Sequence, residues 1–334
     1  MKTVASPPLP TAADVEDAAR LLKGVAVRTP LVSNAALDNL SGGRVFLKPE
    51  ILQRTGSFKF RGAYNRIARI PEAERAGGVV AFSSGNHAQG VAAAARLCGL
   101  AALIVMPSDA PAAKIERTKS HGAEVVLYDR AREDREEIGR KLARERHATL
   151  VPPFDDPYVI AGQGTVGREI CEDLSAEGLS PDIVMMPASG GGLAAGISLA
   201  VKERYPMARL LTAEPADFDD HIRSFHAGAR MQSPPSASSI CDALLCLEPG
   251  EITFEITRRL VGEGLAVTDD EVRTAMRFAF SELKLVVEPG GAVALAAILA
   301  RKIDVRGKTA VAVLSGGNVD AKLFAEAIST GLSR

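Results

Sequence analysis

The stretch that decides the fold runs from Val79 to Ala88 and reads VVAFSSGNHA. Its first four residues, Val79 to Phe82, are apolar and predict a short buried strand. Small polar residues follow, and an alanine-rich segment then indicates a helix over Asn86 to Cys98. The chain therefore passes from strand to helix within a few residues, which is typical of a βαβ unit in a parallel sheet.

The same alternation extends in both directions from this stretch. The expected strands are 45–48, 102–106, 125–128, 183–186, 210–213 and 310–314, and the expected helices are 11–22, 111–121, 132–146, 159–174, 192–203, 251–261, 269–283 and 292–300. A break at Val151-Pro152-Pro153 interrupts the rhythm, which then restarts. We therefore predict an α/β protein with two lobes of parallel sheet and a crossing near residue 152. Ligands of such sheets bind beyond the carboxyl ends of the strands.

Composition limits the classes of function. The 334 residues are 46% hydrophobic and carry a formal charge of −1 at pH 7, without a long block of one sign, which is ordinary for a globular enzyme. This balance argues against nucleic acid or an anionic membrane as the main partner. The longest apolar run, 291–300, is too short to span a bilayer, and residues 1–8 lack the apolar core of a signal peptide. We expect a cytoplasmic protein.

Cysteine spacing gives no sign of a metal site. The four cysteines form no C-x-x-C pair, and no histidine lies at a zinc-like distance from them in the sequence. Cys98 and Cys171 fall on expected helices, so we expect buried thiols there rather than metal ligands.

A lysine between two phenylalanines lies in the segment 55–63, which reads TGSFKFRGA. The rings of Phe58 and Phe60 suggest that the amine of Lys59 is held against an apolar wall, where desolvation lowers its pKa. Such an amine is a good nucleophile toward a carbonyl compound, with which it forms a Schiff base. The alternative is a solvated lysine at the start of an amphipathic helix.

The turn Ser83-Ser84-Gly85-Asn86-His87 joins a strand to the N-terminus of a helix. Its hydroxyl and backbone N–H groups, together with the helix dipole, suit a carboxylate ligand. The alternative is a simple helix cap, with Ser84 or Asn86 as the capping residue.

Consecutive glycines in the segment Ser189-Gly190-Gly191-Gly192-Leu193 predict a second anion site. They let the backbone wrap closely around one phosphate at the start of a helix. A nucleotide-binding interpretation also exists, because Gly190, Gly192 and Ala195 fit G-x-G-x-x-A and Glu214 lies where an acid would bind a ribose. That fingerprint belongs in a first strand–helix turn, however, and here more than half of the chain precedes it.

Ser315 directly follows the last expected strand, in a segment that reads SGGN. A hydroxyl at the carboxyl end of a strand can meet a ring nitrogen, whereas the alternative is an ordinary turn, for which Gly-Gly-Asn is common. A nucleophilic lysine, a carboxylate-binding turn, a phosphate cradle and a ring-directed hydroxyl are together the parts needed for pyridoxal 5′-phosphate and an amino acid.

Four motifs resemble those of threonine dehydratases and serine racemases, which are fold-type II pyridoxal-phosphate enzymes. They are Gly56-Ser57-Phe58-Lys59, Ser84-Gly85-Asn86-His87-Ala88-Gln89-Gly90, Ala161-Gly162-Gln163-Gly164-Thr165 and Ser315-Gly316-Gly317-Asn318. They occur in the family's order, and the resemblance extends from Thr29 to Asp320. It implies two open, twisted α/β domains like those of tryptophan synthase β. Residues 1–52 and 152–334 would form the large cofactor-binding domain and residues 53–151 the small one, with the active site in the cleft between them.

The resemblance also implies a role for each matching residue. Lys59 would form the Schiff base beside Phe58, Asn86 would hydrogen-bond the ring hydroxyl, and Ser315 would meet the pyridine nitrogen. A neutral serine does not enforce a pyridinium there, which favours prompt loss of a β-substituent. The backbone N–H groups of Ser189, Gly190, Gly191, Gly192 and Leu193 would hold the phosphate, although most relatives have glycine in place of Ser189. The residues that would hold the substrate carboxylate are Ser83, Ser84, Asn86 and His87.

The implied reaction converts a β-hydroxy amino acid, such as L-threonine or L-serine, into a 2-oxo acid and ammonia, with Lys59 as the base at Cα. If Ser84 lies on the opposite face of the substrate, it would reprotonate Cα, so an amino-acid racemase is the alternative. A nucleotide-binding protein is a third interpretation. The segment 214–220 resembles the family's divalent-cation loop, in which Glu214, Asp220 and the Phe218 carbonyl would bind Mg²⁺ or Ca²⁺. A solvated acidic turn is the alternative there.

One loop departs from the family pattern. Relatives often have Ala-Asp-Gly beside the substrate, whereas this chain has Cys241-Asp242-Ala243. The difference leaves the side chain of the substrate open, and it is similar to dehydratases of hydroxyectoine breakdown. From the family we also expect a homodimer.

Overall fold

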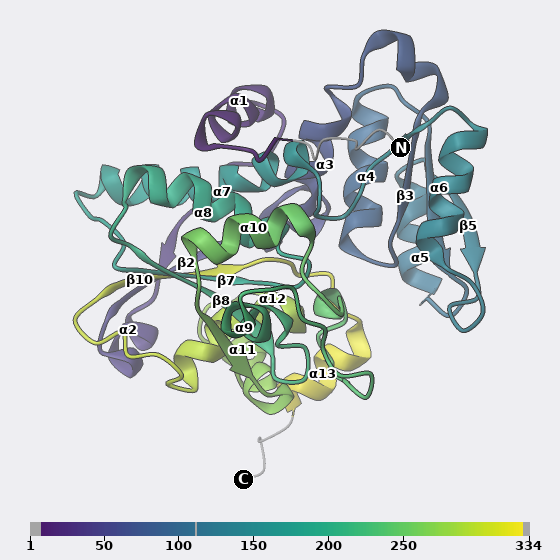
Figure 1. Cartoon of the computed structure of the whole chain (residues 1–334). Helices are drawn as coiled ribbons and strands as arrows, with labels where there is room; N and C mark the ends of the chain where they lie inside the picture. Colours follow the sequence, from purple (N-terminus) through teal and green to yellow (C-terminus); the bar gives the residue numbers. More distant parts are fainter. Residues whose placement is uncertain (1–7, 111, 330–334) are drawn as a thin grey trace.

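The computed structural model describes residues 8–110 and 112–329, which form two sheets flanked by helices (Figure 1). The larger sheet has the order β1-β2-β10-β7-β8-β9, and only the pair β1 and β2 is antiparallel. Its strands are β1 (Val32–Ser33), β2 (Arg44–Pro49), β7 (Ile183–Pro187), β8 (Arg209–Pro215), β9 (Gly264–Val267) and β10 (Thr309–Leu314).

The smaller sheet is parallel throughout, with the order β5-β4-β3-β6. Its strands are β3 (Val79–Phe82), β4 (Ala102–Pro107), β5 (Glu124–Tyr128) and β6 (Thr149–Leu150). The predicted parallel α/β class is confirmed, and β3 has the predicted bounds.

Helices cover the sheets in layers (Figure 1). The α-helices are α1 (Ala12–Leu22), α2 (Ala35–Ser41), α3 (Lys59–Ile67), α4 (Asn86–Leu97), α5 (Ala112–Ser120), α6 (Arg135–Glu145), α7 (Pro157–Ala176), α8 (Gly192–Arg204), α9 (Asp220–Ala227), α10 (Glu251–Leu260), α11 (Asp269–Ser281), α12 (Pro289–Leu299) and α13 (Ala321–Ser329). Short 3₁₀ turns are η1 (Glu50–Leu52), η2 (Arg54–Gly56), η3 (Glu72–Gly77) and η4 (Asp242–Leu244). Helices α7, α8 and α10 lie on one side of the larger sheet, and α2, α11 and α12 lie on the other.

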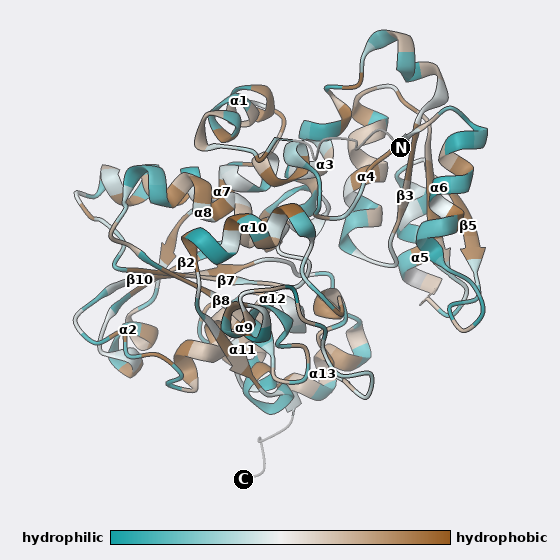
Figure 2. Ribbon diagram, in the orientation of Figure 1, coloured by the Kyte–Doolittle hydropathy of each residue, from teal (hydrophilic) through white to brown (hydrophobic). Residues whose placement is uncertain are grey.

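The central strands of the larger sheet consist mainly of hydrophobic residues (Figure 2), which pack on both faces of the sheet. In β10, Ala310, Ala312 and Leu314 pack toward α11 and α12, whereas Val311 and Val313 pack toward α7 and α8. Successive side chains of a strand point to opposite faces, so a strand covered on both sides is a continuous apolar run rather than an alternating one. For the same reason α12, which is buried among other elements, is apolar around its whole circumference.

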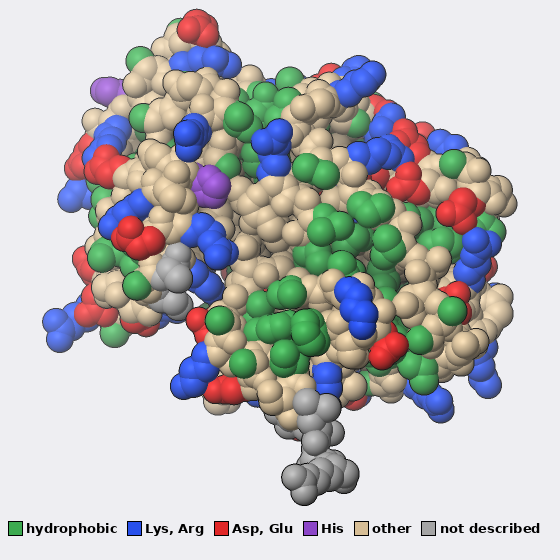
Figure 3. Space-filling view, turned by 180° about the vertical axis from the view of Figure 1, so that it is seen from behind, with side chains coloured by type: hydrophobic (Ala, Val, Ile, Leu, Met, Phe, Trp, Pro, Cys, Tyr) green, Lys and Arg blue, Asp and Glu red, His purple; other side chains and the backbone are tan. Residues whose placement is uncertain are grey.

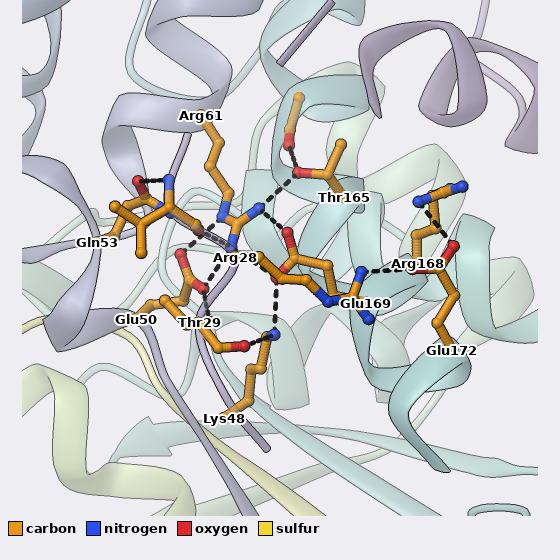
Figure 4. A network of polar contacts seen from close by, with 12 residues as sticks. Arg28, Thr29, Lys48, Glu50, Gln53, Arg61, Thr165, Arg168, Glu169 and Glu172 are labelled. Atoms are coloured by element: carbon orange, nitrogen blue, oxygen red, sulfur yellow. Dashed lines mark hydrogen bonds and ion pairs between the residues drawn. The ribbon is translucent and has the colours of Figure 1, made fainter. Parts of the chain in front are cut away.

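A buried ionic network fixes α3 against α7 and β2 (Figure 4). The Arg61 guanidinium on α3 donates to Glu50 (2.8 Å) and to Glu169 on α7 (2.7 Å), and all three side chains are largely buried. Lys48 on β2 also donates to Glu169, at 2.7 Å. Each charge therefore has an oppositely charged partner, as burial requires. Because Lys59 begins α3, the network also fixes the position of that lysine.

Some expected boundaries shift for identifiable reasons. The helix predicted over 132–146 begins at Arg135, because the Asp134 carboxylate accepts hydrogen bonds from the N–H groups of Glu136 and Glu137 and so caps it. Pro111, the expected start of α5, lies outside the described residues. Cys171 is buried in α7 as predicted, whereas Cys98 lies just beyond α4 and is only half-buried. Among the described helices, none is both long and apolar enough to cross a membrane.

Candidate functional site

A cavity lies where loops from both sheets meet. The loops that line it follow β3, β7 and β10, so the cavity is at the carboxyl ends of parallel strands, as predicted. The structure brings together every residue predicted from the sequence to contact cofactor or substrate. These residues are Phe58, Lys59, Ser83, Ser84, Asn86, His87, Ser189, Gly190, Gly191, Gly192, Leu193 and Ser315.

Lys59 presents an amine without a carboxylate partner among the described residues. Its Nζ donates to the Pro153 carbonyl at 2.6 Å and lies 5.2 Å from the centroid of the Phe58 ring. Burial lowers the pKa of Lys59 to about 8, although the nearby Cys246 acts in the opposite direction. The lysine does begin a helix, but its amine is held in the protein interior rather than in solvent.

The turn 83–87 leaves the N-terminus of α4 open toward the cavity. Gly85 is the N-cap residue, and no side chain caps the helix, so the interpretation of Ser84 or Asn86 as a simple cap is wrong. The first N–H groups of a helix lack partners within the helix and attract anions. Ser84 and these N–H groups can therefore receive a carboxylate.

His87 can bind an anion through its backbone N–H group rather than through a charged imidazole ring. Its Nε2 faces the Val151 carbonyl at 2.9 Å, so Nε2 carries the proton, and Nδ1 has no hydrogen-bond partner among the described residues. Burial and the charge of Lys59 lower the pKa of His87 to about 3. The imidazole is therefore neutral near pH 7.

The segment Ser189 to Leu193, called the glycine bend from here on, is held by three hydrogen bonds from other elements. The Gly190 carbonyl accepts from Thr253 Oγ1 at 2.6 Å, the Ser189 carbonyl accepts from His221 Nε2 at 2.8 Å, and the Ser189 hydroxyl accepts from the Cys246 N–H at 3.2 Å. Gly191 has a φ of +91°, a left-handed conformation that favours glycine. The bend is thus rigid, and α8 begins immediately after it without a side-chain cap.

Close packing explains the first glycine of the bend, Gly190. A Cβ atom on Gly190 would lie 2.3 Å from the ring of Phe154. This position therefore requires glycine. Without a side chain there, the backbone N–H groups of the bend can approach an anion closely.

Ser315 occupies the predicted position at the end of β10. It is 5% exposed, and its carbonyl accepts from the Phe58 N–H at 3.1 Å, which joins the serine segment to the lysine segment. Two side chains that sequence reasoning missed lie beside it: Glu288, the N-cap residue of α12, and Asn318. Burial and the charge of Asp242 raise the pKa of Glu288 to about 7.

Three cationic side chains line the cavity on the side of the smaller sheet. Lys114 pairs with Asp242, and Arg130 pairs with Asp109 at 3.0 Å. Arg135 has no carboxylate partner among the described residues, and its guanidinium lies 5.9 Å from the centroid of the Phe82 ring. On this side of the cavity, the Arg135 charge therefore remains free for an acidic ligand, as far as the described residues show.

A second cluster lies at the end of β8, behind the glycine bend that lines the cavity. Ligand atoms of Glu214, Asp220 and His221 lie within 4.8 Å of one another, and all three residues are buried. Burial raises the pKa of Glu214 well above its usual range and that of Asp220 to about 7. The Glu214 carboxylate accepts from the N–H groups of His221 and Ile222 and does not line the cavity, which removes the ribose-binding acid that the nucleotide interpretation needed.

Residues 22–316 match the family described as "Pyridoxal-phosphate dependent enzyme". The chain belongs to this family. It is 46% identical to an L-threo-3-hydroxyaspartate ammonia-lyase of Pseudomonas, over 93% of this chain and 96% of that protein. It is 42% identical to an L-threonine ammonia-lyase of Thermotoga maritima, over 96% of this chain and 79% of that protein.

Among solved structures, this pyridoxal-phosphate dependent enzyme is similar to maize serine racemase, with a TM-score of 0.90 and 35% identity over 96% of this chain and 98% of that one. The fold is that of fold-type II enzymes, as predicted. The site residues that sequence patterns do not predict have weak local signals. Asp242 and Asn318 lie in segments already singled out, and Glu288 precedes Pro289-Gly290-Gly291, which opens a buried helix, whereas nothing in the sequence around Phe154 indicates its contact with Gly190.

Proposed function

We propose that this chain is an ammonia-lyase that converts a β-hydroxy amino acid, such as L-threonine or L-serine, into a 2-oxo acid and ammonia. The observation that carries the proposal is the buried amine of Lys59, whose pKa is lowered to about 8, in a cavity that the glycine bend also lines. An amine that loses its proton near pH 8 and an uncapped helix N-terminus fit the aldehyde and the phosphate of pyridoxal 5′-phosphate.

Each cavity residue has a part in holding the cofactor. Lys59 would bind the aldehyde covalently next to Phe58, and Ser315 would hydrogen-bond the ring nitrogen. Asn86 would donate to the ring oxygen. The residues whose N–H groups would hold the phosphate are Ser189, Gly190, Gly191, Gly192 and Leu193. When bound, pyridoxal phosphate withdraws electrons from Cα of an amino acid.

The protein groups carry out the remaining steps. The N–H groups of Asn86 and His87, with the hydroxyls of Ser83 and Ser84, would hold the substrate carboxylate at the start of α4. Lys59, once released from the aldehyde, would remove the Cα proton, and its ammonium would then assist departure of the β-hydroxyl. A base with a pKa near 8 is suited to both transfers near neutral pH.

The direct test uses the purified protein with pyridoxal phosphate and a panel of 3-hydroxy amino acids. We expect a visible absorption band, release of 2-oxo acid, and loss of both in Lys59→Ala. A colourless protein that cannot be reconstituted with the cofactor would contradict the proposal.

Racemisation is the second candidate activity, because Ser84 and Lys59 line the same cavity. Ser84 would supply a proton to Cα from the face opposite Lys59. Chiral chromatography after incubation with L-serine measures the D-isomer, and Ser84→Ala should abolish it while ammonia release continues.

We propose 3-hydroxyaspartate as a substrate in addition to the neutral β-hydroxy amino acids. The support is Arg135, whose guanidinium has no carboxylate partner among the described residues, and the likeness to a 3-hydroxyaspartate ammonia-lyase. A second substrate carboxylate would pair with this guanidinium. Assignment to the hydroxyectoine branch stays a prediction, since these observations do not bear on it.

A comparison of the KM values for two substrates tests the assignment of Arg135. Arg135→Ala should raise the KM for 3-hydroxyaspartate by about tenfold or more and leave the KM for threonine within about twofold. Arg130→Ala is the matched control, because Arg130 is already paired with Asp109. Equal effects of Arg135→Ala on both substrates would remove Arg135 from substrate recognition.

The cluster at the end of β8 fits Mg²⁺ or Ca²⁺. Asp220 Oδ2 is buried without a hydrogen-bond partner among the described residues, and carboxylate oxygens are suitable ligands for these ions. Glu214, Asp220 and the Phe218 carbonyl are the proposed ligands, with His221 adjacent. Added Mg²⁺ or Ca²⁺ should raise the unfolding temperature of the wild type, and Asp220→Asn should abolish that rise.

We also propose a homodimer in the cytoplasm, with residues 1–52 and 152–334 as the large domain and 53–151 as the small one. Sheet membership supports the division, since β3 to β6 all lie within 53–151. Hydrophobic side chains gather on one face of the molecule (Figure 3), and Leu52 and Val286 are among the exposed large hydrophobic residues. Sedimentation of the wild type and of Leu52→Glu tests the dimer.

A further inference from the structure

A chain of side-chain hydrogen bonds extends from the surface of α5 into the cavity. Arg117 Nη1 donates to Asn318 Oδ1 at 3.0 Å, and Asn318 Nδ2 donates to Asn86 Oδ1 at 2.8 Å. Asn86 Nδ2 in turn donates to Glu288 Oε1 at 2.5 Å. The chain thus joins α5, the loop after β10, the start of α4 and the start of α12, which are far apart in the sequence.

The Arg117 guanidinium and the Thr55 carbonyl together fix the direction of every hydrogen bond in this chain. A guanidinium can only donate, so the Arg117 side chain requires the oxygen of Asn318. The Asn318 amide nitrogen then faces Asn86 and also donates to the Thr55 carbonyl at 2.7 Å, which can only accept. Asn86 must therefore turn its oxygen toward Asn318 and its nitrogen toward Glu288.

This orientation decides what Asn86 offers to a ligand. Its amide nitrogen carries two hydrogens, and Glu288 takes one of them. The second has no acceptor among the described residues, and Asn86 lines the cavity. Asn86 therefore presents a hydrogen-bond donor, whereas the flipped amide would present a carbonyl oxygen and repel an anionic oxygen.

Two partners in this chain, Thr55 and Glu288, are held in fixed places by the fold. Thr55 has a φ of +62°, a left-handed conformation that is strained for a threonine, and this conformation exposes its carbonyl to Asn318. Glu288 is 3% exposed, and a Cβ atom on Gly316 would lie 2.1 Å from its Oε1, so the carboxyl group has a fixed place. Asp242 and Lys114 are the charged groups that face it, with opposite effects on its pKa.

We propose that Asn318 and Glu288 are positioning residues, which hold the amide of Asn86 with its N–H group toward the ring oxygen of the cofactor. The inference rests on the proposed function, which places pyridoxal phosphate in this cavity. Neither residue needs to touch the cofactor, because both act through Asn86. The exposed Arg117 contributes by fixing the orientation of Asn318.

The test replaces donors by acceptors of the same shape. Asn318→Asp keeps the contact with Arg117 but places an oxygen against Asn86 Oδ1, so the orientation of Asn86 is lost. We expect the Kd of the apoenzyme for pyridoxal phosphate to rise about tenfold, and the absorption maximum of the bound cofactor to shift. Glu288→Ala should act in the same direction, and Glu288→Gln, which keeps an acceptor oxygen, should restore most of the affinity and the wild-type maximum.

Control variants separate this inference from the proposed function. Lys119→Ala lies on the same helix and removes only an exposed pair with Glu116, so its Kd and absorption maximum should equal those of the wild type. A wild type that binds no pyridoxal phosphate overturns the proposed function itself. A wild type that binds it, with Asn318→Asp and Glu288→Ala showing unchanged Kd and absorption maximum, overturns the positioning role alone.

A further variant guards against misfolding. If thermal unfolding shows that Asn318→Asp is not folded, Arg117→Ala removes only the exposed end of the chain and leaves the cavity intact. It should weaken cofactor binding by about threefold, because Asn318 then loses one of the two contacts that fix its orientation and keeps only the bond to the Thr55 carbonyl. Wild-type affinity in this variant would overturn the inference.

Discussion

The reactivity of Lys59 depends on what surrounds its amine. Nζ meets a carbonyl oxygen and an aromatic ring, and neither neutralises a positive charge as a carboxylate would. Desolvation therefore dominates, and the pKa falls from 10.5 to about 8. The sequence indicates part of this environment, since Phe58 lies beside the amine, but Phe60 packs in the core of the smaller sheet and the carbonyl that accepts from Nζ belongs to Pro153, far away in the sequence.

We predict that covalent capture of pyridoxal phosphate by the apoenzyme accelerates with pH, with a midpoint near 8. Only the neutral amine attacks an aldehyde, and the folded chain releases its proton at about 8 rather than at 10.5. By the same linkage, folding stability rises with pH between these two values, because the unfolded chain binds the additional proton. Stopped-flow absorbance over a pH series measures the midpoint, and a value near that of a solvated lysine would show that the amine is not buried.

A second prediction concerns the glycine bend. Gly190→Ala places a Cβ atom 2.3 Å from the Phe154 ring, so the bend must move and the Kd for pyridoxal phosphate should rise at least about tenfold. Gly178→Ala is the control, because nothing lies within 4 Å of the added atom and only its φ of +70° makes the change strained. Gly178→Ala should lose about 1 kcal/mol of stability through backbone strain and keep its cofactor affinity, whereas Gly190→Ala should lose cofactor affinity through the clash with Phe154, as fluorescence titration would reveal.

At the scale of the elements, α3 carries the lysine, and its position depends on buried charges. Arg61 is 1% exposed and bridges Glu50 and Glu169, which belong to η1 and α7. Glu50 and Glu169 carry two negative charges, whereas Lys48 supplies only one positive charge. The guanidinium therefore fixes the helix and neutralises two carboxylates at once.

We predict that Arg61→Ala lowers the free energy of unfolding by about 3–5 kcal/mol, because it leaves the buried Glu50 carboxylate without a counter-charge and Glu169 with Lys48 alone. Chemical denaturation measures the loss. Arg258→Ala removes a partly exposed pair with Glu255 and should cost less than about 1 kcal/mol. Similar losses in the two variants would mean that the buried network contributes no more than a surface pair.

An element can be predicted from the sequence when its signal lies within its own residues, and not when it depends on contacts with distant segments. Strands such as Val79–Phe82 and helices such as α8 have continuous local signals, and they were predicted nearly to the residue. By contrast, β1 and β9 were missed, because β1 has two residues and β9 begins with Gly264 and lies at the edge of the sheet. Glu288 was missed because its role depends on Asn86, which is 202 residues away in the sequence.

At the scale of the whole molecule, the two sheets are connected by different kinds of contact on the two sides of the cavity. On one side α3 packs against α7 through the buried network. On the other side α5 reaches the larger sheet through polar contacts, Lys114 with Asp242 and Arg117 with Asn318. The first side is stiff and the second is partly solvated, so any opening of the cavity is expected at α5.

We predict that Lys114→Ala raises the KM for the amino-acid substrate several-fold with little change in stability. The side chains of Lys114 and Asp242 are 19% and 53% exposed, so their ion pair contributes less than about 1 kcal/mol to folding. It nevertheless connects two segments across the mouth of the cavity, and its loss shifts the population toward open forms that bind substrate weakly. Steady-state kinetics and thermal unfolding give the two quantities.

The variant Asp242→Asn distinguishes this connection from direct substrate binding by Lys114. If the ion pair closes the cavity, Asp242→Asn raises KM as much as Lys114→Ala does, and the double variant adds nothing further, because both changes remove the same interaction. If Lys114 instead binds an acidic substrate, Asp242→Asn releases its charge and lowers KM. The same logic applies to ionic strength, since salt screens a partly exposed pair and should raise the KM of the wild type more than that of Lys114→Ala.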